Sequence, residues 1–390
     1  MPSAGHPRPD PISRAPLQQA GVLTDRDLRS AVRDGWIAAA TPLTDEQFQP
    51  ASLDLRLGPV AYQLRASFLP HRETVRERLE GASNNDLVID RVTLESGATL
   101  QRGSVYLVPL LESLALPPAV RGRSNPKSTT GRLDVFTRVI TDGTPRFDEI
   151  QAGYRGALYL EVSPQSFPVR VYAGGSLNQL RLLEGPTSMT DAALTALYRE
   201  SPLLYDDDDR PLPVERVAFN DGLCMGIDLS GRTTGGVIGY RAHPNPPAVD
   251  LARVGHYDPT EFWEPIKAPV RDGYILEANR FYILVSKERI RVPPEFAAEM
   301  VVYDAGAGEI RTHYAGFFDP GFGFGDGTVL GTKVVMEVRA REVPFMVYDG
   351  QTSFKVWFER LRGRPERVYG VGLASSYQHQ TLSLSKHFRR

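Results

Sequence analysis

The chain has 390 residues, of which 41% are hydrophobic, and a formal net charge of −2. This length is sufficient for two domains with full cores, and the small net charge gives no bulk attraction to nucleic acid or to an anionic membrane. Cys224 is the single cysteine, so a disulfide within the chain is impossible and a cysteine-based zinc site is not expected. No apolar run approaches the ~20 residues of a membrane span, and we expect a cytoplasmic protein.

The first 20 residues are rich in proline and lack the apolar core of a signal peptide, so we expect a disordered N-terminal lead. A short helix is predicted over 22–37, with Thr24 as its N-cap, Asp27 at the third helical position and Gly35 as its stop. From residue 49 onward, short apolar or alternating runs are separated by Gly, Pro, Asn or Asp. This pattern is typical of an antiparallel sandwich or a closed barrel. A second helix is predicted over 189–200, with Thr190 as its cap.

The chain also repeats itself. Pro117-Pro118 lies 176 positions before Pro293-Pro294, and Asp54 matches Asp228 at an offset of 174. The offset of 176 relates four further pairs: Tyr106 and Tyr282, Glu112 and Glu288, Glu161 and Glu337, and Gly174 and Gly350. A fixed spacing of this kind indicates a duplicated domain.

The repeat divides the chain into a first copy, residues 21–203, and a second copy, residues 215–390. Between them, residues 204–214 contain the acidic, proline-bearing stretch YDDDDRPLP. We interpret this stretch as a solvated linker, because four adjacent carboxylates repel one another and cannot converge on one metal ion without a folded frame. Each copy is expected to be mainly β with a few short helices.

The first copy contains the segment PKSTTGR at 126–132, where two cations and three hydroxyls fall close together. Such a segment suits a phosphate-bearing ligand, and Gly131 lets the backbone approach it closely. Arg132 can equally be a surface salt-bridge residue. At the same offset the second copy has VYDAGAG (302–308), which has lost these groups. We therefore expect one active copy fused to a supporting copy.

A carboxylate follows in the strand-like run GALYLEVSP. Alternation places Leu160 and Val162 on one face and Glu161 on the other, so Glu161 faces a cleft or solvent if its neighbours face the core. A carboxylate there can act as a base if its surroundings raise its pKa, and an exposed strand glutamate is the alternative. The Gly-rich run at 317–327 is interpreted as a tight turn, because it lacks the Lys-Ser/Thr ending of a phosphate loop.

The order of these segments resembles a known family. The chain reads QPASLDLRLG, LPPAVRG, PKSTTGR, GYRGALYLEV, GGSLNQLRL and finally SYQHQTLSLSKHF. This order resembles dCTP deaminase of the dUTPase superfamily, and more closely its long, duplicated bacterial form. The resemblance implies two tandem dUTPase-like domains, each a distorted β-barrel or jelly roll, and a homo-oligomer with sites between subunits or domains. It also implies hydrolytic deamination of dCTP to dUTP and ammonia.

The resemblance further implies roles for individual residues. Glu161 would be the general base for the water that attacks C4 of cytosine, with Ser128 and Arg132 as its catalytic partners. The implied substrate-binding residues are Lys127, Thr129, Thr130, Gly131, Val139, Ile140, Thr141, Tyr159, Leu160, Gln179, Tyr369, Ser376, Gln380 and Lys386. Lys127 stands where the family has arginine. The replacement keeps the positive charge but loses the two parallel hydrogen bonds that a guanidinium can donate to phosphate. Ser376 replaces a family lysine, so Lys386 is the candidate for the missing phosphate charge.

The expected partner is a nucleotide, with no nucleic acid and no membrane. Mg²⁺ is expected only on the triphosphate, and zinc is not expected because the chain lacks the H-x-E and P-C-x-x-C patterns of zinc deaminases. We expect one working site per chain, with its base and hydroxyl segment from the first copy and its closing tail from the second.

Three alternatives stay open. Lys127 and Ser376 favour a nucleotide-binding or sensing protein without catalysis, and the duplication alone permits a β-sandwich module for another ligand. A bifunctional enzyme that also hydrolyses dUTP is the third. The sister dUTPases carry an Asp three residues before a Tyr, and Gln151 occupies that position before Tyr154. An amide cannot take a proton from water as a carboxylate can, which argues against the bifunctional alternative.

Overall fold

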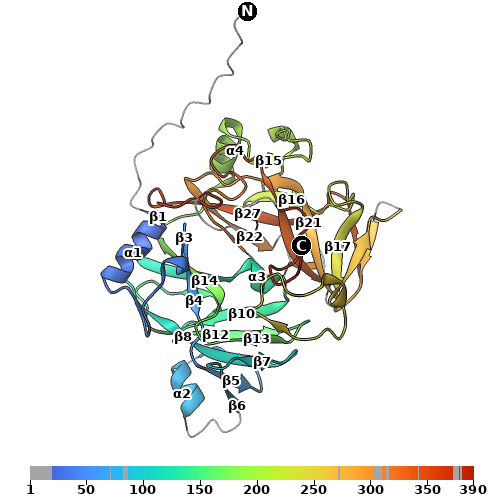
Figure 1. Cartoon of the computed structure of the whole chain (residues 1–390). Coiled ribbons are helices and arrows are strands. Elements are labelled where there is room, and N and C mark those ends of the chain that lie inside the picture. The colour runs from blue at the N-terminus through green and yellow to red at the C-terminus, as the bar shows by residue number, and fades with distance from the viewer. Residues whose placement is uncertain are drawn as a thin grey trace, which may run out of the picture.

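The computed structural model describes residues 20–70, 72–81, 87–270, 273–302, 310–312, 316–340, 342–371, 377 and 380–390. Strands dominate this part of the chain (Figure 1), which confirms the mainly-β prediction. Its α-helices are short: α1 (Asp25–Arg33), α2 (Val75–Glu80), α3 (Ser128–Gly131) and α4 (Asp191–Glu200). Its 3₁₀ turns are η1 (Asp45–Gln47), η2 (Val214–Arg216) and η3 (Pro259–Glu261). Among these described helices, none is long and apolar enough to cross a membrane.

Both helices predicted from the sequence form at the expected places. Thr24 caps α1 in a capping box, in which its backbone N–H donates to Asp27 Oδ2 at 3.0 Å. Thr190 caps α4, where its hydroxyl accepts from the backbone N–H of Ala193 at 3.3 Å. Each cap satisfies backbone donors that the first helical turn leaves unpaired.

The first copy contains two six-stranded sheets and a third, smaller sheet. One sheet has the order β11 (Glu149–Ile150), β9 (Val120–Pro126), β14 (Ser176–Glu184), β4 (Ser52–Arg56) and β3 (Phe48–Gln49), with β1 (Gly21–Val22) beside β14. The other has the order β10 (Val135–Ile140), β12 (Arg155–Pro164), β8 (Val105–Ala115), β5 (Val60–Leu64) and β6 (Val88–Thr93), with β2 (Ile37–Ala39) beside β8. The third sheet pairs β7 (Ala98–Leu100) with β13 (Val169–Val171).

The second copy repeats this plan, above the first in Figure 1. One sheet has the order β19 (Trp263–Lys267), β17 (Val237–Ala242), β21 (Phe281–Ile290), β25 (Thr332–Ala340) and β23 (Ile310–Thr312), with β15 (Leu204–Tyr205) beside β21. The other has the order β16 (Leu223–Gly226), β27 (Thr352–Arg360), β22 (Phe296–Val302) and β24 (Phe317–Phe318), and β20 (Gly273–Leu276) pairs with β26 (Phe345–Tyr348).

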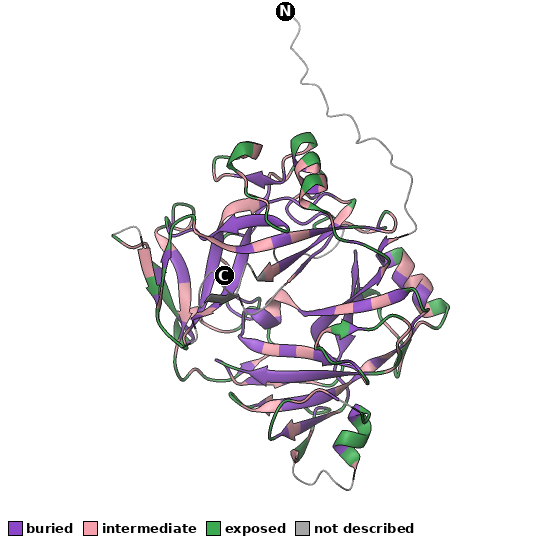
Figure 2. Cartoon of the chain, turned by 180° about the vertical axis from the view of Figure 1, so that it is seen from behind, coloured by how far each residue is buried: buried purple, intermediate pink, exposed green. Residues whose placement is uncertain are grey.

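The two copies share a core and a strand pairing. Burial concentrates on the strands of both copies (Figure 2), and Trp263, Phe281 and Val335 of the second copy belong to the same buried cluster as the strands of the first. In addition, β18 (Val249–Asp250) of the second copy pairs in parallel with β13 of the first. Continuous burial of apolar area across the contact fixes the copies relative to each other.

Equivalent hydrogen bonds in the two copies show the duplication directly. In the first copy, the backbone N–H of Gln101 donates to the Tyr106 hydroxyl at 3.1 Å. In the second copy, the backbone N–H of Glu277 donates to the Tyr282 hydroxyl at 2.9 Å. The donor and the acceptor in the second copy each lie 176 positions after their counterparts in the first, as the sequence predicts.

One pair from the sequence is out of register. The backbone N–H of Gly58 donates to Pro109 O at 2.8 Å, and that of Asp228 donates to Val285 O at 2.9 Å. Because Pro109 and Val285 keep the offset of 176, the counterpart of Asp228 is Gly58. The predicted match of Asp228 with Asp54 is therefore wrong by four residues.

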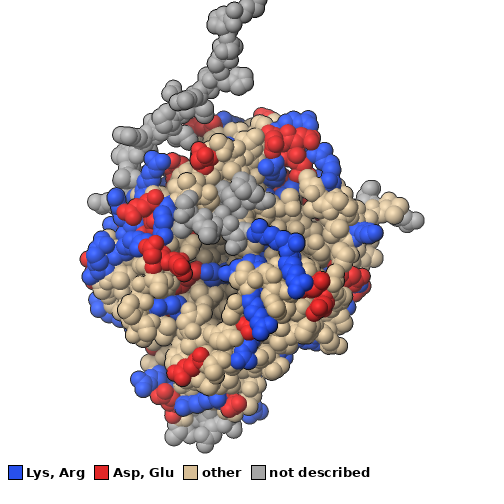
Figure 3. Space-filling model, viewed as in Figure 1, with Lys and Arg blue, Asp and Glu red and all other residues tan. Residues whose placement is uncertain are grey.

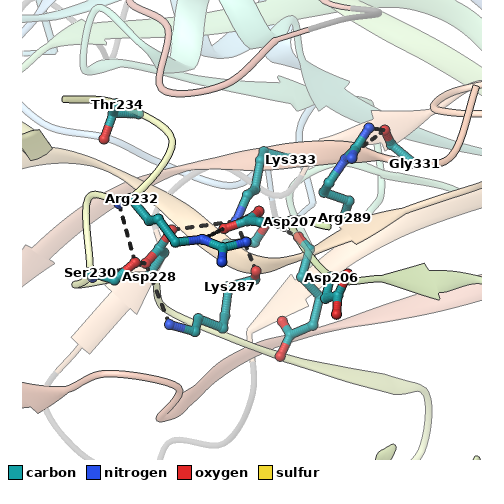
Figure 4. Close-up of polar contacts among 12 residues, drawn as sticks. Asp206, Asp207, Asp228, Ser230, Arg232, Thr234, Lys287, Arg289, Gly331 and Lys333 are labelled. Atoms are coloured by element: carbon teal, nitrogen blue, oxygen red, sulfur yellow. Dashed lines mark hydrogen bonds and ion pairs between the residues drawn. The ribbon is translucent and has the colours of Figure 1, made fainter. Parts of the chain in front are cut away.

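The segment 204–214, expected to be a solvated linker, packs against the second copy instead. Leu204 and Tyr205 are buried in β15, which pairs with β21. Asp207 lies 2.7 Å from Lys333 Nζ, which is also 3.4 Å from Asp228 (Figure 4). The acidic stretch thus contacts cations of the second copy. These ion pairs offset the repulsion between its carboxylates, so the segment can pack against the protein.

The helix before this segment also belongs with the second copy. Leu194 and Tyr198 of α4 are buried in the second core cluster, together with Leu203 and Leu204. The Tyr198 hydroxyl donates to Leu212 O at 2.8 Å, which ties the helix to the far end of the acidic segment.

We predict that Asp207→Asn lowers the free energy of unfolding by about 2 kcal/mol, because it removes one partner of a buried ammonium. The side chains of Asp207 and Lys333 are only 10% and 3% exposed. The matched control is Asp208→Asn, because Asp208 is 43% exposed in its pair with Arg232; it should cost clearly less, since solvent screens an exposed pair. Urea unfolding measures both, and equal losses would contradict the packed arrangement.

Candidate active site

A cavity of about 230 Å³ lies where the two copies meet. On the face drawn in Figure 3, basic side chains gather beside a hollow. The first copy contributes Gln49, Asp54, Pro126, Lys127, Ser128, Thr129, Arg132 and Gln179 to the wall. The second contributes Met300, Gly316, Phe317, Phe318, Asp319, Phe322, Val334, Val335, Glu337, Tyr369, Tyr377, Gln380 and Lys386.

The segment PKSTTGR forms one wall as a single helical turn. The backbone N–H groups of Thr130 and Gly131 both donate to Lys127 O, at 2.8 and 3.0 Å. This turn, α3, presents Ser128 to the second copy, where the Ser128 hydroxyl lies opposite Gly316. A Cβ atom at position 316 would lie 4.0 Å from this hydroxyl, in ordinary van der Waals contact, so the two copies meet here.

Arg132 follows the turn and is buried rather than on the surface. Its guanidinium donates to Gln380 Oε1 at 2.7 Å and to Ser383 O at 3.0 Å, and it lies 3.9 Å from the ring centroid of Tyr377. Its Nε is 4.0 Å from Glu337 Oε1. The interpretation of Arg132 as a surface residue is therefore wrong, since partners from the second copy surround it.

Lys127 and Lys386 place two cations in the cavity. Lys127 forms an ion pair with Asp54 Oδ2. Burial lowers the pKa of Lys386, and the charge of Lys127 lowers it further. An anion bound between two ammonium groups that repel each other would relieve this repulsion, so this end of the cavity suits phosphate oxygens.

Glu337 is another carboxylate of the cavity wall. It lies on β25 and is 4% exposed. Burial raises its pKa to about 8, although the charge of Arg132 acts in the opposite direction. A carboxyl group whose pKa is close to neutral, in a cavity and beside a cation, has the properties of a general acid or base.

Glu161, the predicted base, does not face this cavity. It lies on β12, directly opposite Arg138 on β10, and is buried in an ion pair with the Arg138 guanidinium. The strand alternation was read correctly, but the face opposite Leu160 is covered by the neighbouring strand's arginine. Glu161 thus lies outside the described wall of this cavity, and its role as the base stays a prediction.

Five more of the predicted residues lie on the same two strands or at their ends. They are Val139, Ile140, Thr141, Tyr159 and Leu160, and they are not among the described residues that line the cavity. At the offset of 176 the counterpart of Tyr159 is Val335, which does line it. For Tyr159, as for Glu161, the equivalent strand position of the second copy therefore lines the cavity.

The other predicted residues are mostly brought together. Lys127, Ser128, Thr129, Arg132, Gln179, Tyr369, Gln380 and Lys386 line the cavity. Thr130 and Gly131 are buried within α3, behind its wall, and Ser376 lies outside the described residues. The C-terminal segment closes the cavity through Gln380, which accepts from Arg132 and donates to Lys333 O at 2.9 Å.

The aromatic and acidic part of the wall was not predicted from the sequence. Phe317, Phe318, Asp319 and Phe322 line the cavity, although the run that contains them was interpreted only as a turn. A signal was present, because Asp319 stands three residues before the aromatic Phe322, as in the dUTPase pattern.

Asp319 bears on the second hydrolytic step. Burial raises the pKa of this carboxyl to about 6, while the nearby charge of Arg181 lowers it. Gln151, which argues against that step in the sequence, is exposed and is not among the described residues of the cavity wall. The argument from Gln151 therefore does not apply to this cavity.

No group of three or more His, Cys, Asp or Glu side chains within the described ranges could hold a metal ion. Asp54 nevertheless has a buried oxygen, Oδ1, without a hydrogen-bond partner in the described structure. Mg²⁺ in nucleotide sites usually takes one or two carboxylates and completes its shell with phosphates and water. The residues present therefore fit a magnesium ion carried by a triphosphate.

Comparisons with known proteins match both halves of the chain to one family. The family model for the 2'-deoxycytidine 5'-triphosphate deaminase (DCD) N-terminal domain matches residues 19–186, and that for the C-terminal domain matches residues 190–388. The solved structure of 2'-deoxycytidine 5'-triphosphate deaminase from Agrobacterium tumefaciens is 42% identical, with a TM-score of 0.81, and the match covers 90% of this chain and 100% of that chain.

Two curated relatives are each named "dCTP deaminase, dUMP-forming". That of Corynebacterium jeikeium is 29% identical over 162 residues, which is 41% of this chain and 80% of the relative. That of Rhodococcus jostii is 30% identical over 165 residues, which is 42% of this chain and 80% of the relative. Since the two family models together account for nearly all of the described residues, the chain belongs to the dCTP deaminase family, whose members are enzymes that act on a C–N bond.

Proposed function

We propose that this chain hydrolyses dCTP to dUTP and ammonia in the cavity between its two copies, with Glu337 as the general base. The observation that carries this proposal is the juxtaposition of Glu337 from the second copy with Arg132 and the Ser128 turn from the first. A pure binding site needs the cations but not a buried carboxyl group with a raised pKa.

The proposed reaction needs one proton carrier. Ionised Glu337 takes a proton from a water molecule, and the water oxygen forms a bond to C4 of the cytosine ring. The electron pair displaced from the C4–N3 double bond goes to N3. Glu337 then returns the proton to the amino group, the C4–N bond breaks as the electron pair on N3 reforms the double bond, and ammonia leaves. The remaining proton moves from the C4 hydroxyl to N3, which gives the C4 carbonyl and the N3–H of uracil. Ser128 and Arg132 would position the water and stabilise the developing charge.

The triphosphate would lie toward Lys127 and Lys386, where the cavity is cationic. Lys127 is already paired with Asp54, so a phosphate that approaches Lys127 competes with this carboxylate. A magnesium ion on the triphosphate would reduce that conflict, because the unpaired Asp54 oxygen could then face a cation. The ion neutralises phosphate charge, and the base chemistry stays with the side chains of the chain.

Hydrolysis of dUTP to dUMP is the second candidate. It is favoured by Asp319, a carboxylate in the same cavity, and by the printed names of the relatives, which are dUMP-forming. The products formed from dCTP in the presence of Mg²⁺ distinguish the two candidates. Deamination releases ammonia, whereas hydrolysis of dUTP also releases pyrophosphate.

We expect dUTP and ammonia to appear together from dCTP when the products are separated by chromatography and ammonia is assayed. If dUMP and pyrophosphate accompany the ammonia, the enzyme is bifunctional and Asp319 becomes the residue to replace. If dCTP binds without releasing ammonia, the proposed catalysis is refuted and a nucleotide sensor takes its place.

Glu337→Gln should lower kcat for deamination by roughly three or more orders of magnitude, because the amide cannot accept the proton. Its melting temperature at pH 8 should not fall, since burial already disfavours the ionised carboxylate. The matched control is Glu161→Gln, which breaks an ion pair with Arg138 outside the described cavity wall. A kcat loss in Glu161→Gln equal to that in Glu337→Gln would refute the assignment of the base.

The pH dependence of kcat/KM should follow Glu337. The base must be ionised, and burial raises its pKa to about 8. The ratio kcat/KM should therefore rise with pH and level off above about pH 8. Well below that pH it should fall about ten-fold for each pH unit. A profile that is flat between pH 6.5 and 9 would show that another group limits the reaction.

A further inference from the structure

Arg181 is a buried cation at the contact between the copies that the proposed chemistry does not use. It lies on β14, two residues after Gln179, so both side chains leave the strand on the same face. Gln179 reaches the cavity, while Arg181 is fully buried behind its wall. One side of its guanidinium is held by the second copy, where Nη1 donates to Glu359 Oε2 and to Ala298 O, both at 3.1 Å.

The other side of the guanidinium meets three consecutive residues of the cavity wall. Its centre lies 4.0 Å from the ring centroid of Phe317, and Nη2 donates to Phe318 O at 3.4 Å. Nη2 is also 3.9 Å from Asp319 Oδ1. A planar, charged group that stacks on a ring while it donates at its edge fixes position and orientation together, which an ammonium cannot do.

We propose that Arg181 is a positioning residue for the nucleotide, because it holds the wall formed by Phe317, Phe318 and Asp319 in place. This inference rests on the proposed function of the cavity. The strand that begins this wall is short, since β24 has two residues and pairs with β22 alone in the described sheet. Loss of the guanidinium would let the wall shift, and a shift of this kind weakens a preorganised site.

Arg123 provides a matched control on the neighbouring strand. It is directly opposite Arg181 in the pairing of β9 with β14, and its guanidinium binds the same Glu359, at 2.6 Å. Its second ion pair is with Glu299, at 3.0 Å. Both arginines therefore join the copies through buried charge pairs, but Arg181 also contacts the cavity wall.

The test compares Arg181→Lys with Arg123→Lys in the full-length enzyme, by dCTP binding, steady-state deamination and thermal melting. We expect Arg181→Lys to raise both Kd and KM for dCTP about ten-fold while kcat stays within about three-fold, because the wall binds ground and transition states alike. Arg123→Lys should lower the melting temperature by a similar amount and leave Kd and KM unchanged. Equal Kd values in the two variants would overturn the proposal.

The readouts separate this proposal from the function on which it rests. If the wild type binds dCTP without releasing ammonia, the deaminase proposal fails, while the Kd comparison still decides the role of Arg181. If the wild type does not bind dCTP, both proposals fail.

If Arg181→Lys does not fold, Arg181→Met combined with Glu359→Gln removes both members of the buried pair. Its Kd should then exceed that of Glu359→Gln alone about ten-fold, and equal values would overturn the proposal.

Discussion

The approach of Arg132 to Glu337 is the interaction on which the rest of the site depends. The two side chains come from different copies of the repeat, and their atoms are 4.0 Å apart in a region that is almost closed to solvent. A buried guanidinium and a buried carboxyl group keep this arrangement only if each has further partners. Arg132 has them in Gln380, Ser383 and the Tyr377 ring, so the C-terminal segment is part of the site rather than an addition to it.

This arrangement explains why a duplicated chain keeps only one set of hydroxyls and cations. Each copy supplies one half of the site: the first gives the turn that contains Ser128, and the second gives the strand that contains Glu337. Within a single chain these two halves meet once. The strand β25 connects the site to the acidic segment, because Lys333 binds Gln380 through its carbonyl oxygen and Asp207 through its ammonium. Fusion of the copies thus fixes a contact that two free domains would have to find by association.

Much of this could be predicted from the sequence, because local patterns decide it. The capped helices, the punctuated strands and the offset of 176 all depend on nearby residues or on direct repetition. The turn at 126–132 was recognised because its side chains are chemically unusual together. The choice between Glu161 and Glu337 could not be made in this way, because both occupy the same position in equivalent strands. Only the packing of the two copies decides which one faces the turn, and Arg138 beside Glu161 was not recognised as its partner. Asp319 was not predicted, because the Asp pattern was compared only with the first copy, where Gln151 occupies the position, and not with the second.

The central claim is that one nucleotide lies between the two copies of the same chain. A crystal structure of the Glu337→Gln variant with dCTP and Mg²⁺ tests it most directly, because the variant should bind substrate without consuming it. We expect the cytosine ring next to position 337 and Ser128, and the triphosphate next to Lys127 and Lys386. A nucleotide bound against Glu161 and Arg138, with the cavity between the copies left free, would contradict the account.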